Sequence, residues 1–315
     1  MTDSVTTVPD AGPFVHPALF YRTQEEYVSG VGGFVRAALR AEEPTFVAVP
    51  EANLDALRGW LGGDAADVDF ADMAVLGRNP GRILAALQDF ADRHPGRAAR
   101  IVGEPIWPSR SRSETLEATR HEALINTAFA GRPATILCPY DVTALPEAVV
   151  ADARRTHPTL LENGRDLDSA AYIDPAVVCA DCDEPLPEPV HAMILPYAAG
   201  GLAQTRQRAR DWLKGTSLDR ARKDDLVLAI SEATANSVAH GGGAGILRLW
   251  TGEHGTAVAE IRDEGHLANP LAGRRRPTLT SGNGGRGLWM IHQLCDLVEI
   301  RATGTGLTLR LHLAP

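Results

Sequence analysis

The segment SEATANSVAHG at residues 231–241 places three chemically capable side chains one helical turn apart. Glu232, Asn236 and His240 follow at steps of four, so on a helix they form one polar stripe. A carboxylate can take a proton from an attacking hydroxyl, and an amide oxygen is a hard ligand that suits Mg²⁺. A solvated helix surface has the same pattern, so this segment alone leaves both interpretations open.

A second segment, RDEGH at 262–266, places a carboxylate where a strand is expected to end. Asp263 closes an apolar run and Gly265 follows it at a turn. A carboxylate at a strand end can accept a hydrogen bond from an exocyclic amine such as that of adenine.

A third segment, GNGGRGLWM at 282–290, places Gly284, Gly285 and Gly287 at the start of a predicted helix. Glycines there let backbone N–H groups approach phosphate oxygens, and the helix dipole favours negative charge. The order of the three segments over about 55 residues is more specific than any one of them. Glu122 and Asn126 repeat the four-residue spacing but lack the other two segments.

The pattern of apolar runs predicts two domains. Over residues 14–160, strands at 45–50, 68–73, 99–107 and 134–141 alternate with helices at 24–41, 51–62, 79–93, 114–131 and 144–156. This alternation predicts an α/β domain with a mostly parallel sheet. Residues 161–189, rich in acids and prolines, are interpreted as a linker.

The second predicted domain, residues 190–315, groups helices with an antiparallel sheet, as an α+β sandwich does. Helices are expected at 201–214, from 224 to the glycine stop at 241, and at 287–296. Strands are expected at 245–251 and 257–263, and a closing hairpin turns at Gly304-Thr305-Gly306.

Composition and charge restrict the function classes. The net charge of −9 argues against direct nucleic-acid binding, which needs a basic surface. No long apolar run that could span a membrane and no secretion signal is recognised, so a cytoplasmic protein is expected. The run Arg274-Arg275-Arg276 is interpreted as solvated charge.

Four cysteines are too few for a disulfide framework. Cys179 and Cys182 have the spacing of half a zinc site or a redox pair, and His191 could add a ligand. Without a second pair, two plain thiols are the favoured interpretation, while metal binding or redox sensing stays open.

Residues 190–313 resemble a known family through EATANSVAHG, RDEG and GGRGLWMIHQLCD. These segments are similar to the N, G1 and G2 boxes of the GHKL (Bergerat-fold) ATPases, and within them to anti-sigma-factor serine/threonine kinases. The resemblance implies ATP and Mg²⁺ as cofactors, and a sigma factor and an anti-anti-sigma (STAS-type) protein as partners. It also implies a role in transcription regulation under stress in an actinobacterium, and a homodimer as one expected assembly.

The resemblance assigns residue roles. Glu232 would activate a hydroxyl of the partner, Asn236 would hold Mg²⁺, and Asp263 would bind adenine. The remaining implied ATP-binding residues are Gly265, Gly284, Gly285, Arg286, Gly287 and Leu288.

One departure keeps alternatives open. His266 stands near the position where many relatives carry a second glycine, so a non-catalytic, ATP-dependent partner-binding switch is the main alternative. A histidine-kinase-like sensor is the third hypothesis, although no helical hairpin with a phosphoacceptor histidine precedes the domain.

The first domain also resembles a family. The stretch FVHPALFYRTQEEYVSGVGGFVRAALRAEEPTFVAVP, with GEPIW and HEALIN, is similar to MEDS sensory domains, which have a degenerate RecA-like α/β fold. The resemblance implies sensing of an unidentified small molecule or signal. The candidate pocket residues are His16, Glu104, Trp107, His121 and Glu122.

Overall fold

The computed structural model describes residues 14–162, 165–277 and 286–315. The chain divides into two compact units, which are described separately. Unit 1 comprises 1–76, 86–110 and 122–178, and unit 2 comprises 77–85, 111–121 and 179–315. Among the described residues, no helix combines the length and the apolar character needed to cross a membrane.

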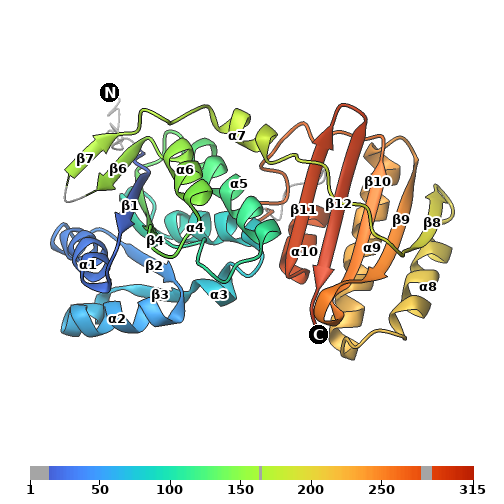
Figure 1. Cartoon of the computed structure of the whole chain (residues 1–315), viewed down its shortest axis with the longest axis horizontal. Helices are drawn as coiled ribbons and strands as arrows, with labels where there is room; N and C mark the ends of the chain where they lie inside the picture. The colour runs from blue at the N-terminus through green and yellow to red at the C-terminus, as the bar shows by residue number, and fades with distance from the viewer. Residues whose placement is uncertain (1–13, 163–164, 278–285) are drawn as a thin grey trace, which may run out of the picture. The chain divides into compact units, whose positions relative to one another are not determined.

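Unit 1 is built on a mostly parallel sheet (Figure 1). The strand order is β3-β2-β4-β5-β1-β6-β7, and only the last pair is antiparallel. The strands are β1 (Pro17–Tyr21), β2 (Thr45–Val49), β3 (Asp69–Asp72), β4 (Ala99–Gly103), β5 (Ala134–Asp141), β6 (Thr159–Glu162) and β7 (Arg165–Asp168).

The helices that follow these strands alternate with them along the chain. They are α1 (Gln24–Arg40), α2 (Glu51–Leu61), α3 (Met73–Leu76), α4 (Ile83–Asp92), α5 (Arg112–Ala128), α6 (Glu147–Thr156) and α7 (Pro175–Asp181), with 3₁₀ turns η1 (Gly62–Asp67) and η2 (Pro80–Arg82). The division between the units passes through α4, α5 and α7.

The predicted mostly parallel sheet is confirmed, and β5 has the predicted bounds. Strand β1 was not among the expected strands, although it pairs with both β5 and β6 in the middle of the sheet. Within the stretch interpreted as a linker, the structure places β7, paired with β6, and helix α7. The dipeptide Asn-Gly at 163–164, a strong hairpin signal, stands between the two strands.

Unit 2 contains an antiparallel sheet of order β11-β12-β10-β9-β8 (Figure 1). Its strands are β8 (Met193–Ala198), β9 (Ala244–Thr251), β10 (Ala257–Asp263), β11 (Leu297–Thr303) and β12 (Gly306–Leu313). The helices are α8 (Leu202–Leu213), α9 (Arg220–His240) and α10 (Arg286–Leu294), with a 3₁₀ turn η3 (Glu253–Gly255). The predicted bounds of β10 and the closing hairpin are confirmed.

Helix α9 begins where Asp219 caps it, with the carboxylate accepting from the backbone N–H of Arg222 at 2.8 Å. Its apolar residues Leu226, Ile230 and Ala233 are buried in one core with the inner side chains of the sheet. This packing fixes the rotation of α9, and with it the direction in which its polar stripe points.

The other face of the sheet carries a ladder of buried charges. Across neighbouring strands, Arg248, Glu260, Arg310 and Glu299 lie directly opposite one another. Arg310 holds Glu260 with two bonds, from Nε at 2.9 Å and from Nη2 at 2.6 Å. Both bonds go to one oxygen, Oε2, and hydrogen bonds between two charged groups are among the stronger ones in proteins.

The triple-arginine run is only partly solvated, so that interpretation was wrong for its first member. Arg274 is 1% exposed and its Nη2 lies 3.3 Å from the Glu117 carboxylate within unit 2. Arg275 and Arg276 are exposed. Glu117 also accepts from Arg301 Nη1 at 2.6 Å, because a buried carboxylate requires compensating donors.

The ladder yields a stability prediction. Glu260→Gln removes the charge that Arg310 faces in a buried position, so we expect unit 2 to lose about 3 kcal/mol of unfolding free energy. Urea unfolding followed by tryptophan fluorescence measures the loss. The exposed Glu253→Gln is the control, expected within about 0.5 kcal/mol of the unsubstituted protein. Equal stability of the two variants would contradict a structural role for the ladder.

Candidate functional site

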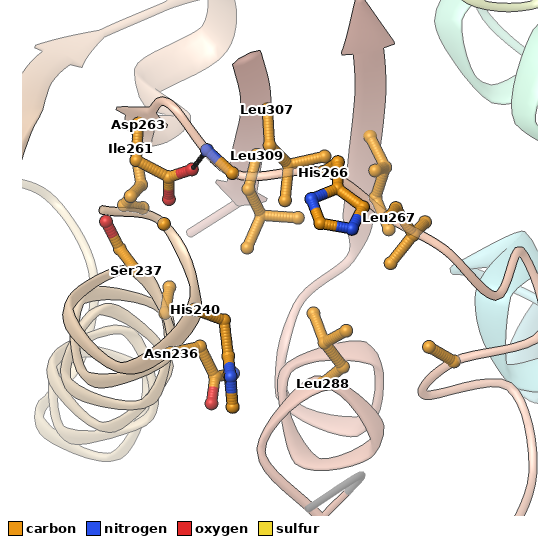
Figure 2. Close-up of a pocket in the computed structure, with 15 residues that line it drawn as sticks. Asn236, Ser237, His240, Ile261, Asp263, His266, Leu267, Leu288, Leu307 and Leu309 are labelled. Atoms are coloured by element: carbon orange, nitrogen blue, oxygen red, sulfur yellow. Dashed lines mark hydrogen bonds between the residues drawn. The ribbon is translucent and has the colours of Figure 1, made fainter. Parts of the chain in front are cut away.

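A pocket of about 210 Å³ opens in unit 2 between α9, the end of β10 and the first turns of α10. Its walls are largely apolar, from Ile261, Leu267, Leu288, Ile300, Leu307 and Leu309. Its polar side chains are Asn236, Ser237, His240, Asp263 and His266. Figure 2 shows Asn236 and His240 projecting from α9, with Leu288 on α10. Apolar walls with a few polar groups are typical of small-molecule sites.

Asp263 is held at the end of β10 by the turn that follows. Its Oδ1 accepts the backbone N–H of Gly265 at 2.7 Å, the bond drawn in Figure 2. A Cβ on Gly265 would lie 2.7 Å from that oxygen, and one on Gly241 would lie 2.4 Å from the carboxyl carbon. Both glycines are therefore required by close packing around one carboxylate.

Gly287 brings the start of α10 against the polar stripe of α9. A Cβ at this position would lie 2.9 Å from Asn236 Nδ2 and 3.0 Å from Glu232 Oε2. A side chain at position 287 would therefore overlap both Asn236 and Glu232. Glu232 and Asn236 thus face the helix start rather than bulk solvent alone, which distinguishes this stripe from an ordinary solvated surface.

The inner side of α9 is tied to β8 by a buried hydroxyl pair. Tyr197 donates its hydroxyl to Ser237 Oγ at 2.7 Å. Burial raises the pKa of Tyr197 to about 12, so the phenol stays protonated and remains a donor. A Cβ on Gly245 would collide with the phenol, 2.4 Å from its oxygen. This contact fixes the helix at the level of the pocket.

The geometry fits ATP and Mg²⁺. The apolar slot ends at the Asp263 carboxylate, as a purine with an exocyclic amine requires. The start of α10 supplies backbone N–H groups beside Asn236, whose amide oxygen is a suitable Mg²⁺ ligand.

A second polar cluster lies in unit 1. The ligand atoms of His16, Glu122, Cys138 and His157 lie within 4.8 Å of one another, and all four residues are buried. Burial and the neighbouring His157 lower the pKa of His16 to about 4. Burial by itself would raise the pKa of Glu122, but the adjacent His157 and His16 outweigh it and lower that pKa. Burial and the Glu122 charge raise the pKa of the Cys138 thiol well above its usual value.

The five residues expected in a sensory pocket are not gathered at one place. His16 and Glu122 are in contact, with 3.2 Å between Nε2 and Oε2. Glu104 has different partners and accepts from Asn53 Nδ2 at 2.8 Å. The ring of Trp107 stacks under the guanidinium of Arg110, and His121 is buried within unit 2.

Comparison with known families decides what the two units are. Residues 15–158 match the family described as MEDS, the MEthanogen/methylotroph DcmR sensory domain. Residues 195–313 match the family described as the histidine kinase-like ATPase domain. The chain joins a MEDS domain to a histidine kinase-like ATPase domain. Every residue that lines the pocket lies within the ATPase domain.

Two solved structures are similar to parts of the chain. The RsbU and RsbW domains of Rv1364c from Mycobacterium tuberculosis are 20% identical, with a TM-score of 0.30; the match covers 40% of this chain and 33% of that one. The histidine kinase domain from the Erythrobacter litoralis EL346 blue-light activated histidine kinase is 11% identical, with a TM-score of 0.25; the match covers 64% and 91%. No curated protein matches the chain.

The structure places most of the expected nucleotide residues of the ATPase domain around the pocket. The residues that line it are Asn236, Asp263, Gly265 and Leu288. Gly287 packs against both Asn236 and Glu232. Arg286 begins α10 and is exposed. Gly284 and Gly285 lie outside the described residues.

Several pocket residues were not predicted from the sequence. Ser237 and Gly241 flank the expected stripe, and Leu307 and Leu309 come from β12. The glycine run after α9 was the available signal for Gly241. In the MEDS domain, Cys138 and His157 join the two predicted residues but carry no local motif.

Gly287 provides a test of the site that spares the fold. An alanine there would push aside only the ends of two side chains, so Gly287→Ala is expected to cost less than about 1 kcal/mol of stability. Because those ends belong to Asn236 and Glu232, we expect Mg²⁺-dependent ATP binding to weaken by about tenfold or more, measured by calorimetry. Gly33→Ala, in open space on α1, is the control. Unchanged binding in Gly287→Ala would show that the junction is not part of the site.

Glu104 gives the MEDS domain a pH-dependent stability. Burial and the Asp141 charge raise the pKa of Glu104 to about 8, against the hydrogen bonds from Asn53 and Tyr21. The free energy of unfolding is therefore highest below the ordinary pKa near 4.5, where Glu104 is protonated in both states. It falls as the pH rises towards 8, because the unfolded chain loses this proton more easily than the folded domain. We expect Glu104→Gln to gain on the order of 4 kcal/mol relative to wild type between pH 5 and 8.5.

Urea unfolding of both proteins at several pH values measures this difference. The exposed Glu51→Gln is the control for removing a carboxylate from the same domain. A difference between wild type and Glu104→Gln that does not vary with pH would refute the raised pKa.

Proposed function

We propose that the ATPase domain binds ATP with Mg²⁺ and phosphorylates a serine or threonine of a STAS-type anti-anti-sigma partner. The protein would thereby control the release of a sigma factor in the cytoplasm, under input from the MEDS domain. The proposal includes a Bergerat-fold arrangement of the ATPase domain and a degenerate RecA-like fold of the MEDS domain.

One observation carries the proposal. Gly287 touches the space of both Glu232 and Asn236, while Asp263 and Gly265 line the same pocket as Asn236. Three segments that are separate in the sequence therefore converge on one site. Each has the chemistry that one part of a nucleotide needs, and the match to the ATPase family covers all three.

The residues of the pocket divide the binding work. Asp263 accepts from the exocyclic amine of adenine, while Ile261, Leu307 and Leu309 contact the ring faces. Asn236 holds Mg²⁺ through its amide oxygen, and backbone N–H groups at the start of α10 contact the phosphates. Mg²⁺ supplies neutralisation of phosphate charge when it is bound.

Glu232 acts on the hydroxyl of the partner. The hydroxyl oxygen forms a bond to the γ-phosphorus, the bond from that phosphorus to the β–γ bridging oxygen breaks, and the hydroxyl proton passes to Glu232. The leaving group is ADP. Because phosphoryl transfer needs little covalent assistance, positioning by the α9–α10 junction supplies most of the catalysis.

A second candidate function is favoured by His266. This imidazole lines the pocket beside Leu267, and the two occupy the corner where many of the resembled ATPases carry a second glycine. In that case ATP acts as a conformational ligand, and the protein works only by holding its partners. The two functions share nucleotide binding and differ in phosphoryl transfer.

The proposal predicts separable effects of two substitutions. Glu232→Ala removes the base, so transfer to the partner should fall by about 100-fold or more while ATP binding stays within about threefold. Asn236→Ala removes the Mg²⁺ ligand, so Mg²⁺-dependent ATP binding should weaken by about tenfold or more. Radiolabelled ATP with candidate STAS-type proteins measures transfer, and calorimetry measures binding. Glu264→Ala, exposed beside the pocket, is the matched control.

Each outcome separates the hypotheses. Full transfer by Glu232→Ala would remove that residue from the mechanism. Intact ATP binding with no transfer to any partner captured from the native cytosol would favour the binding switch. Acid-labile label on the protein itself would indicate a histidine-kinase-like reaction instead.

A further inference from the structure

The MEDS domain contains a cluster with the composition of a metal site. His16 precedes β1, Glu122 lies on α5, Cys138 lies on β5 and His157 follows α6. Each is at most 1% exposed. We propose that these four side chains bind one divalent transition-metal ion, with Zn²⁺ as the ion that fits them best.

Four of the six distances between the ligand atoms match the edges of a tetrahedral site, and the other two are at most 4.8 Å. Zn²⁺ bonds of about 2.0–2.3 Å to nitrogen, oxygen and sulfur place the ligand atoms about 3.3–3.6 Å apart. Glu122 Oε2 lies 3.2 Å from His16 Nε2 and 3.3 Å from His157 Nε2. Cys138 Sγ lies 3.4 Å from both His16 Nε2 and Glu122 Oε2. One ion among these atoms requires only small side-chain movements.

The surroundings of His16 orient its Nε2 as a ligand. Asn126 donates its amide N–H to the carbonyl of Thr156 at 2.8 Å, so its Oδ1 is the acceptor that faces His16. His16 Nδ1 lies 3.1 Å from that oxygen and therefore carries the hydrogen. Nε2, which lies 3.2 Å from Glu122 Oε2, is then left with a lone pair. Metal-bound histidines commonly have their other nitrogen held in this way.

His157 has the same arrangement from another element. Its Nδ1 lies 2.8 Å from the carbonyl oxygen of Ala153, which can only accept. The Nε2 lone pair therefore also faces the Glu122 carboxylate. His157 Nε2 and Glu122 Oε1 are buried atoms without a hydrogen-bond partner among the described residues. Two imidazole lone pairs within 3.3 Å of one carboxylate oxygen are unfavourable unless a cation lies among them.

The ligand set identifies the class of ion. Two imidazoles, one thiolate and one carboxylate suit Zn²⁺ and disfavour Mg²⁺ or Ca²⁺, which prefer oxygen ligands. Four protein ligands close a tetrahedral shell, which is typical of structural sites rather than hydrolytic ones. Among the described residues, no other group of three or more such side chains is gathered closely enough. The pair Cys179 and Cys182 therefore belongs to no such cluster.

The position of the cluster gives metal binding a structural consequence. Strands β1 and β5 are neighbours, with Ala18 opposite Cys138, and β6 pairs with the other edge of β1. An ion held by residues before β1, on β5, on α5 and after α6 would join these elements. Its binding free energy would therefore add to the stability of the MEDS domain.

The test uses the full chain, freed of metal by a chelator and titrated with Co²⁺ under reducing conditions. We expect one equivalent to bind, with a thiolate-to-cobalt charge-transfer band and the intense visible bands of tetrahedral Co²⁺. Zn²⁺ should displace the Co²⁺ and raise the midpoint of thermal unfolding. Less than about 0.1 equivalent bound by wild-type protein would overturn the proposal and leave a proton-bridged ion pair as the explanation of the cluster.

Variants locate the ion. Cys138→Ser should remove the charge-transfer band and weaken metal binding by about 100-fold. Cys179→Ser/Cys182→Ser, the matched control, should leave both unchanged. A band that persists in Cys138→Ser, or disappears in the control, would place the ion elsewhere. Asn126→Leu keeps all four ligands and should weaken binding by about 10- to 100-fold, because it removes only the group that orients His16.

Discussion

The close approach of α10 to α9 at Gly287 is the contact on which the candidate nucleotide site depends. A side chain larger than hydrogen would occupy the space that Glu232 and Asn236 use, so the site exists only because this position lacks one. The sheet beneath supplies the other half. Strand β10 ends at Asp263, and the turn at Gly265 packs against that carboxylate. Gly287 and Gly265 are therefore both required for close packing around the site. The packed core beneath α9 holds the helix in place between them.

Buried carboxylates are stabilised in three different ways in this chain. Glu260 is paired with the guanidinium of Arg310 in the sheet of unit 2. Glu104 has hydrogen-bond donors but no cationic partner within the described part of the chain, and its raised pKa reflects that difference. Glu122 faces two imidazole nitrogens whose lone pairs point towards it. The charge of Glu260 is balanced by a protein cation, whereas the raised pKa of Glu104 favours its neutral, protonated form. The third has the ligand set of a metal centre, because its neighbours are themselves electron-pair donors.

Regular periodicity was enough to predict most of the fold and little of the MEDS cluster. Strands β5 and β10 are continuous apolar or alternating runs, and their bounds follow from that pattern. Strand β1 has only five residues and begins with Pro17. A proline usually argues against a strand, although the first position of a strand tolerates one. The nucleotide residues could be predicted because their motifs lie in a fixed order within one domain. Cys138 and His157 could not, since their relation to His16 arises from parallel pairing across more than a hundred residues, which leaves no local spacing.

The closed character of the proposed metal site restricts what the MEDS domain can sense through it. Four protein ligands leave no coordination position for a small molecule, and the cluster is buried, so a substrate would not bind the ion directly. Input at this place would instead be the occupancy of the ion or the state of the Cys138 thiol, because either change removes a bond that joins β5 to the histidines beside β1 and α6. Such an input alters the stability of the domain rather than the shape of a pocket. It can therefore be measured by unfolding in the absence of nucleotide, independently of whether the ATPase domain transfers phosphate.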